Sequence, residues 1–196
     1  CALGDPIAER VRAVREVVPS FSVVLDPNER FENPEGAIQV SKSLEEFDDV
    51  LFESPVPQDR IDWYVQLRGE IPQKMALHLT SIHQLLPALK AEAAHAYNLL
   101  GPLKPFVDWA TLCRQAGCPT WRGTGMDLGV RDMSSVHAAA AAGCTLPSDI
   151  IGHLLREDDL LEEPIQFEDG ALVVPDLPGL GIKLDREALE RYRVPD

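Results

Sequence analysis

Three residues that could bind a metal ion follow short apolar runs directly. Asp26, Glu53 and His78 each end such a run, and they are spaced by 27 residues (53 − 26) and 25 residues (78 − 53). In a sheet of parallel strands joined by helices, equivalent strand ends meet at one edge. Two carboxylates and a third ligand at that edge suit a hard divalent cation, with waters and substrate oxygens completing its shell. This spacing predicts a metal site of Asp26, Glu53 and His78.

The same spacing has a second interpretation, because an acidic residue after a strand often caps the next helix. Three candidates in equivalent positions favour the metal site, but spacing alone does not decide between the two. His78 is the weakest member, since imidazole suits softer ions than Mg²⁺. It is expected to bind another metal, to orient a ligand, to act as an acid or base, or simply to form a hydrogen bond within the fold.

A repeated alternation of strands and helices is expected to carry these residues. The expected strands cover 21–25, 50–52, 75–77, 96–99, 119–121 and, more weakly, 149–151. Segments with helical spacing separate them, which predicts an α/β fold with a parallel sheet. Both an open doubly wound sheet and a closed barrel have this rhythm. No glycine-rich fingerprint follows the first strand, so a dinucleotide-binding fold loses support.

Local signals mark several turns and helix ends. Serine, aspartate and proline favour helix starts, whereas glycine favours helix ends and tight turns. The expected helix starts are Asp5-Pro6, the capping box at 43–46 and Asp185; the expected helix ends are Gly117 and Gly143; and the expected hairpin turn is Asp169-Gly170.

Composition excludes several classes of protein. The 196 residues carry a net charge of −14, which argues against nucleic acid as a partner. No apolar run reaches the length of about 18 residues that a membrane span needs, and no signal peptide is visible. Four cysteines without a CxxC pair are expected to be reduced thiols. We therefore expect a single cytoplasmic domain over residues 1–196.

Two motifs and the tail resemble a known family. Asp26-Pro27-Asn28 is similar to the Asp-x-Asn that ends the third barrel strand in the mandelate racemase and muconate lactonizing branch of the enolase superfamily, and Glu53-Ser54-Pro55 to the Glu-x-Pro of the fourth. Residues 175–185 closely resemble the closing segment of that family. The resemblance implies a partial (β/α) TIM-type barrel, from about strand three to strand eight. It also implies that the N-terminal capping domain and first strands of the barrel are absent.

The resemblance also implies an activity. Members of this branch abstract the proton next to a carboxylate and stabilise the resulting enediolate with Mg²⁺. The chain is accordingly expected to derive from a dehydratase, racemase, epimerase or cycloisomerase that acts on a small carboxylate and forms a homo-oligomer at full length. A fragment of such a barrel is expected to lack turnover by itself. The alternative is a non-catalytic relative that binds a ligand or a subunit; His78 and the absence of the usual lysine on the sixth strand favour it.

Three further residues are candidates for catalytic roles. The Asp-x-Asn resemblance includes Asn28. Arg122 follows the expected strand 119–121, which corresponds to the seventh strand of the family's barrel, and it suits either a substrate carboxylate or a surface salt bridge. Asp149 stands where the family often has an acidic residue, and it suits either a donor to the enediolate or a local pair. Neither acid–base dyad of the family is complete, because Asn98 replaces an aspartate, and the general base is left unassigned.

Overall fold

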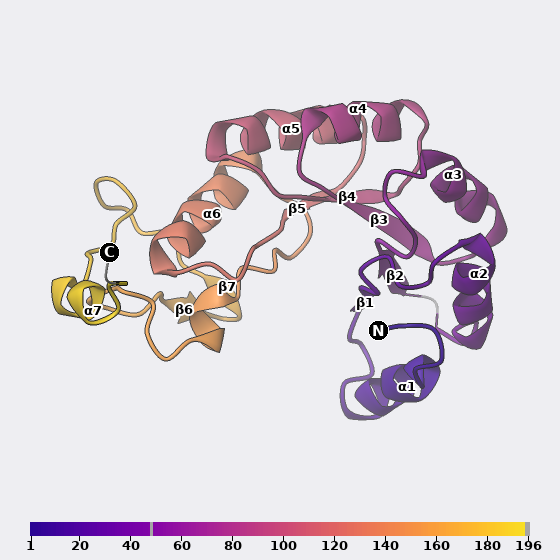
Figure 1. Ribbon diagram of the computed structural model, residues 1–196, viewed down its shortest axis with the longest axis horizontal. Coiled ribbons are helices and arrows are strands. Elements are labelled where there is room, and N and C mark those ends of the chain that lie inside the picture. The colour runs from indigo at the N-terminus through magenta and orange to yellow at the C-terminus, as the bar shows by residue number, and fades with distance from the viewer. Residues whose placement is uncertain (48, 195–196) are drawn as a thin grey trace. The chain divides into compact units, whose positions relative to one another are not determined.

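The computed structural model describes residues 1–47 and 49–194, and its helices and strands alternate along most of the chain (Figure 1). The elements are α1 Ile7–Val17, β1 Val23–Leu25, α2 Pro34–Ser43, β2 Val50–Glu53, α3 Ile61–Glu70, β3 Lys74–Leu79, α4 Ile82–Lys90, β4 Ala96–Leu99, α5 Leu103–Gln115, β5 Thr120–Arg122, α6 Gly129–Ala142, a short 3₁₀ helix η1 Gly152–Leu155, β6 Phe167–Glu168, β7 Ala171–Leu172 and α7 Arg186–Arg191.

Five strands form one sheet in chain order, β1-β2-β3-β4-β5. Strand β2 pairs in parallel with both β1 and β3: Leu25 lies beside Phe52, and Glu53 lies beside Ala76. The prediction of an α/β fold with a parallel sheet is therefore confirmed. The residues divide into two compact units, which we describe separately: Cys1–Asn98 with Gln115–Pro119, and Leu99–Arg114 with the residues from Thr120 onward.

In the first unit, one face of the strands packs against helices. Phe52 is fully buried and meets the ring of Phe31 edge-on, with the ring centroids 5.8 Å apart. Helices α2 and α3 pack against each other and lie on the same side of β1 to β3 (Figure 1). The residues of α3 that reach the core are Tyr64 and Leu67, whereas Val65 is 46% exposed.

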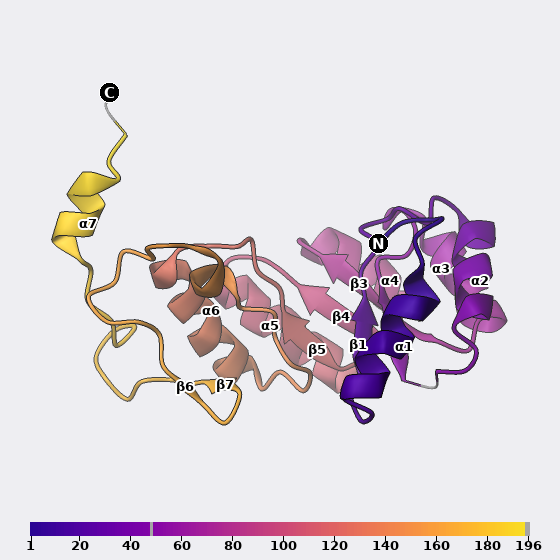
Figure 2. The same ribbon diagram turned by 90° about the horizontal axis from the view of Figure 1, so that it is seen from below.

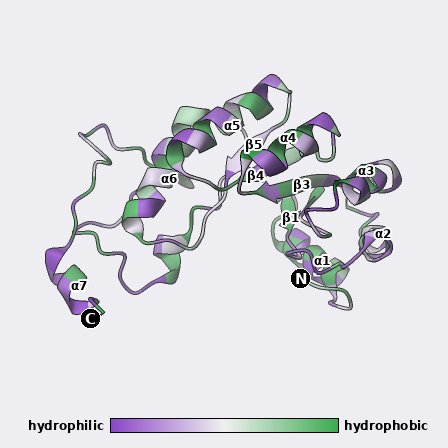
Figure 3. Ribbon diagram, turned by 45° about the horizontal axis from the view of Figure 1, so that its top comes forward, coloured by the Kyte–Doolittle hydropathy of each residue, from purple (hydrophilic) through white to green (hydrophobic). Residues whose placement is uncertain are grey.

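Helix α4 shows how sequence and packing combine in this unit. The Ser81 side chain accepts a hydrogen bond from the Gln84 backbone N–H and caps the helix. Hydrophobic and hydrophilic residues alternate along it (Figure 3), and it buries Leu85 and Ala88. Pro87 lies inside the helix. The predicted helix in this region is confirmed despite that proline.

The second unit has a small core of its own. Five residues form it: Met133, Val136, Ile150, Leu161 and Ile165. The chain beyond η1 consists largely of loops around this core, with the β6–β7 hairpin and α7 as its regular elements (Figure 2). A buried polar pair, Asp132 and His153, lies in the same unit. Asp132 Oδ2 accepts a hydrogen bond of 2.8 Å from the His153 backbone N–H, and it also lies 3.1 Å from His153 Nδ1.

Several local predictions are confirmed. Gly143 adopts φ 62° and ends α6, and Gly117 is likewise left-handed with φ 74°. Asp169 and Gly170 both have positive φ and turn the β6–β7 hairpin. The Asp185 carboxylate accepts hydrogen bonds from two backbone N–H groups at the start of α7.

One predicted helix start is wrong. No helix begins at Ser43, because Ser43 is the last residue of α2 and its hydroxyl donates to the Val40 carbonyl. Asn33 caps that helix instead, through a hydrogen bond from the Gly36 N–H. The helix start predicted at Asp5-Pro6 is confirmed, since α1 begins at Ile7 directly after Pro6. The Asp5 side chain does not cap it, however; its carboxylate accepts a hydrogen bond from the Ala2 N–H.

The strand expected at 149–151 is also wrong. These residues belong to no strand. Ile150 is buried in the core of the second unit, whereas Ile151 is 39% exposed. One anchored side chain holds the segment in place without a neighbouring strand. In the part of the chain that the structure describes, no helix is long and apolar enough to cross a membrane.

His95 gives the fold a pH dependence. The Met75 backbone N–H donates to His95 Nδ1 at 3.1 Å, which requires that nitrogen to be unprotonated. Burial, together with the charges of Arg68 and Lys74, lowers the pKa of His95 below its ordinary value of 6.5.

The folded chain therefore favours neutral His95, and the unfolded chain binds more protons as the pH falls through about 6.5. Stability is expected to decrease from about pH 7 to about pH 5. His95→Asn keeps an acceptor and does not titrate, so it should reduce this decrease, as measured by urea denaturation across that range. The exposed control His83→Asn should keep the wild-type slope. Equal slopes for the His95 variant and the wild type would contradict the assignment.

Candidate functional site at the strand ends

The strand register sets the face on which the predicted metal ligands lie. Side chains alternate between the two faces of a sheet, and directly paired residues share a face. The β1–β2 register, continued one residue beyond Leu25, brings Asp26 beside Glu53. Glu53 pairs with Ala76, so His78, two residues further along β3, lies on the same face as Glu53. All three residues belong to the first unit.

Glu53 is the best-defined member of this group. It is 7% exposed, and its Oε1 accepts a hydrogen bond of 2.7 Å from Asn98 Nδ2 at the middle of β4. His78 Nδ1 lies 3.6 Å from the same oxygen. Three neighbouring strands thus contribute a carboxylate, an imidazole and an amide to one small region.

Asp26 is held by the loop that follows β1. It is half-buried, and its Oδ1 accepts a 2.7 Å hydrogen bond from the Asn28 backbone N–H. Asn28 is exposed and has φ 49°, a conformation that asparagine tolerates better than most residues. Its observed role is therefore to shape the loop that carries Asp26. A catalytic role for Asn28 stays a prediction.

The loops after β1 and β2 are tied together. The Glu29 N–H donates to the Ser54 carbonyl at 2.8 Å, and the Phe31 N–H donates to the Pro55 carbonyl at 3.1 Å. Ser54, directly after Glu53, has φ 45°, which is a strained conformation for serine. Non-glycine residues in this region are frequent at functional sites, so the strain at Ser54 supports this strand end as a candidate site.

A buried tyrosine reports the electrostatic potential behind these strand ends. Tyr64 is fully buried, and its hydroxyl donates to the Val56 carbonyl at 2.7 Å. Burial raises the pKa of Tyr64 far above its ordinary value, and the negative charges of Glu29, Asp26 and Glu53 raise it further. The potential in this region is therefore negative, which favours a cation.

The predicted ligands do not form a closed shell. Among residues 1–47 and 49–194, no group of three or more His, Cys, Asp or Glu side chains is arranged to hold a metal ion. Some of the donors nevertheless suit a cation. Glu53 and His78 lie beside each other, and the Oδ1 atom of buried Asn98 accepts no hydrogen bond from the described residues. An amide oxygen that accepts no hydrogen bond and lies on a side chain beside a carboxylate is a suitable ligand for a hard cation.

Arg122 is buried within the second unit and is not part of a surface salt bridge. It is 1% exposed; its Nη1 donates to the Gly101 carbonyl at 2.8 Å, and its guanidinium lies 4.7 Å from the centre of the Phe106 ring. Burial lowers the pKa of Arg122, the charge of Arg131 lowers it further, and Asp149 is among the acidic residues that raise it. These contacts support a role in packing. Binding of a substrate carboxylate by Arg122 stays a prediction.

Asp149 is exposed in the second unit, and its backbone carbonyl accepts a hydrogen bond of 2.9 Å from the Thr124 hydroxyl. It lies in the segment wrongly predicted as a strand, so its expected place at a strand end is not observed. A catalytic role for Asp149 stays a prediction as well.

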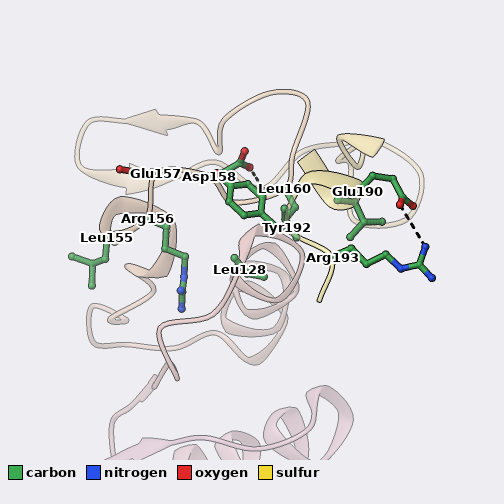
Figure 4. Close-up of a pocket in the computed structure, with 10 residues that line it drawn as sticks. Leu128, Leu155, Arg156, Glu157, Asp158, Leu160, Glu190, Tyr192 and Arg193 are labelled. Atoms are coloured by element: carbon green, nitrogen blue, oxygen red, sulfur yellow. Dashed lines mark hydrogen bonds and ion pairs between the residues drawn. The ribbon is translucent and has the colours of Figure 1, made fainter. Parts of the chain in front are cut away.

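A surface pocket of about 890 Å³ also lies in the second unit (Figure 4). Leu128, Leu155 and Tyr192 contribute apolar surface to it, and an ion pair of 3.5 Å joins Glu190 and Arg193 in its lining. None of the six predicted site residues lines this pocket. We therefore base the candidate site on the strand ends.

Sequence reasoning missed two residues of this site. Asn98 was considered only as the replacement of a catalytic aspartate, yet its position at the strand 20 residues after His78 was a usable signal. Tyr64 was not among the predicted site residues. Its hydroxyl bond to Val56 depends on how α3 packs behind β2, and no local pattern in the sequence reveals that contact.

Comparisons with known proteins agree on one family. The profile of the family described as "Enolase C-terminal domain-like" matches residues 4–188. A chloromuconate cycloisomerase from Cupriavidus pinatubonensis is 26% identical over 97% of this chain and 53% of its own length. An N-succinylamino acid racemase from Thermus thermophilus is 27% identical over 93% of this chain and 51% of its own length. The chain thus spans about half the length of these curated relatives.

The structural likeness extends over nearly the whole chain. The crystal structure of an N-succinyl Arg/Lys racemase from Bacillus cereus covers 95% of this chain and 52% of its own, with a TM-score of 0.83 and 22% identity. At this identity the likeness shows the fold alone. It confirms the predicted partial (β/α) TIM-type barrel.

The hydrogen bond from the Tyr64 hydroxyl to the Val56 carbonyl is expected to contribute to the unfolding free energy of the chain. Tyr64→Phe leaves the buried Val56 carbonyl without this donor, which is expected to cost about 1–3 kcal/mol of unfolding free energy. Tyr192→Phe, at a 52% exposed position, is the matched control and should change stability by less than about 0.5 kcal/mol. Chemical denaturation measures both. A Tyr64 variant as stable as the control would show that the bond contributes little.

Proposed function

This chain belongs to the enolase C-terminal domain-like family, and on that basis we propose that it carries the cation-binding strand ends of an enzyme that abstracts the proton α to a carboxylate. The relatives named above are a cycloisomerase and racemases, so the coarse class is an isomerase or lyase of the enolase superfamily. The reaction, the substrate and the metal requirement of this protein are part of the proposal.

One observation carries it: Glu53 is a buried carboxylate on the face that the register also gives to Asp26 and His78. Burying a charge is costly unless partners compensate for it. Asn98 supplies one hydrogen bond to Glu53, His78 Nδ1 lies 3.6 Å from the same oxygen, and a bound cation would add further compensating positive charge. The negative potential that raises the pKa of Tyr64 favours the same ligand.

In the proposed site, Asp26 and Glu53 hold Mg²⁺ or another divalent cation, and His78 is the third ligand. When bound, the cation supplies positive charge at the oxygen where an enediolate develops. The chain's own residues position it: Asn28 fixes the Asp26 loop through its backbone N–H, and Asn98 orients Glu53. The nitrogen donor of His78 supports a softer ion than Mg²⁺.

We propose a small-molecule carboxylate as the substrate, in keeping with the succinyl and muconate compounds in the names of the relatives. Homo-oligomerisation and a cytoplasmic location stay predictions, as do the roles of Arg122 and Asp149. The general base stays unassigned.

The cation site can be tested by calorimetry. Asp26→Asn and Glu53→Gln each remove one carboxylate ligand with little change in shape, and each is expected to weaken Mg²⁺ and Mn²⁺ binding about 100-fold or more. Glu45→Gln, an exposed acid of the same unit, should leave the affinity unchanged. Unchanged affinity in both site variants would show that the cation binds elsewhere or that the assignment is wrong.

The chemistry can be tested by isotope exchange. The full-length protein that contains this chain, supplied with Mg²⁺ in D₂O, should incorporate deuterium at the α-carbon of an acceptable sugar acid or N-acyl amino acid, as mass spectrometry detects, and Glu53→Gln should abolish the exchange. Cation binding without exchange in a broad screen of such acids would instead favour a non-catalytic, ligand-binding relative.

A further inference from the structure

Asn98 has an amide with one satisfied end and one unsatisfied end. It is 1% exposed. Its Nδ2 donates to Glu53 Oε1 at 2.7 Å, whereas its buried Oδ1 accepts no hydrogen bond from the residues that the structure describes. Buried amide oxygens are nearly always paired, because an unpaired acceptor loses its water without compensation. The unsatisfied Oδ1 therefore points to a ligand.

The orientation of this amide is determined by its neighbour. An amide turned by 180° would place Oδ1 against Glu53 Oε1, and two acceptor oxygens would then meet at hydrogen-bond distance. The carboxylate therefore requires Nδ2 on its side. Oδ1 is consequently the end of the amide that does not donate or accept at Glu53 Oε1, and it is buried on a side chain that contacts that carboxylate.

The surrounding charges identify the chemistry of the missing partner. Glu53 lies in contact with the amide, and His78 on β3 lies beside Glu53. Asp26 directly follows β1, which pairs with β2 on the side away from β3. The charges of Asp26, Glu29 and Glu53 also raise the pKa of Tyr64. A negative potential favours a cation over a neutral donor, and an amide oxygen is a hard ligand.

We propose that Asn98 Oδ1 is an additional ligand of the cation bound at Glu53. This inference rests on the proposed function and deepens it. The ligand set then comprises Asp26, Glu53, His78 and Asn98, from four neighbouring strands. Among the described residues, the His, Cys, Asp and Glu side chains alone do not form a group of three or more that could hold a metal ion. An amide oxygen would add a ligand of another type to the site.

Calorimetry with MgCl₂ and MnCl₂ tests the proposal on four proteins: the wild type, Asn98→Leu, Asn98→Asp and Gln73→Leu. Asn98→Leu removes both ends of the amide and should weaken binding about 10-fold or more. Asn98→Asp keeps an oxygen ligand and adds charge, and the cation relieves its repulsion with Glu53. It should therefore bind at least as tightly as the wild type.

Gln73→Leu is the matched control. Gln73 is also a buried amide of the first unit, 4% exposed, but its partner is Ser41 and it precedes β3 at the strand end opposite His78. Its loss should leave cation affinity unchanged. Circular dichroism verifies that each variant is folded; if Asn98→Leu does not fold, the isosteric Asn98→Asp alone decides by the criterion given above.

Three results would overturn the inference while leaving the proposed function intact. These are wild-type affinity in Asn98→Leu, equal weakening in Asn98→Asp, and equal weakening in Gln73→Leu. The second would mean that Asn98 acts only by holding Glu53. A wild-type protein that binds neither cation would overturn the proposed function and this inference together.

Discussion

The candidate site depends on the alternation of side chains along parallel strands. One face of β2 and β3 carries Phe52 and Met75, which are fully buried in the core of the first unit. The other face carries Glu53 and, two residues after its partner Ala76, His78. Because the apolar face fixes the register, it also fixes which polar side chains share the opposite face. A shift of one residue would move Glu53 into the apolar core.

The electrostatics of the strand ends follow from that arrangement. Asp26, Glu29 and Glu53 act on the same buried tyrosine, and the most buried of the three carboxylates is compensated by an amide and approached by an imidazole. A cation bound at these strand ends would be attracted by all three carboxylates, which would link the stability of the region to its proposed function.

Sequence reasoning succeeded where one local pattern decided the outcome. The strand Ala96–Leu99 was predicted with its observed bounds, and Asp185 and Gly143 mark helix ends as expected, because caps depend on a few neighbouring residues. It failed where two patterns competed: Ser43 fits a helix start, but Asn33 had already begun a helix that ends there. The segment 149–151 is apolar enough for a strand, yet only Ile150 is anchored in the core.

The placement of the carboxylates was predictable from the sequence, whereas their supporting residues were not. Spacing along the chain places Asp26 and Glu53 at the same edge of the sheet, since each repeat of strand and helix returns to that edge, and their role as cation ligands stays a prediction. The hydrogen bond from Asn98 to Glu53 joins residues 45 positions apart, and only the packed sheet reveals it.

The most direct measurement is an anomalous difference map from crystals of the protein grown with Mn²⁺, collected at a wavelength where manganese scatters anomalously. The account predicts a peak in contact with the Glu53 carboxylate, at about 2.0–2.6 Å from its oxygen and on the side of the sheet that Asp26 and His78 share. A map with no peak at Glu53, or with manganese bound only elsewhere on the molecule, would contradict it.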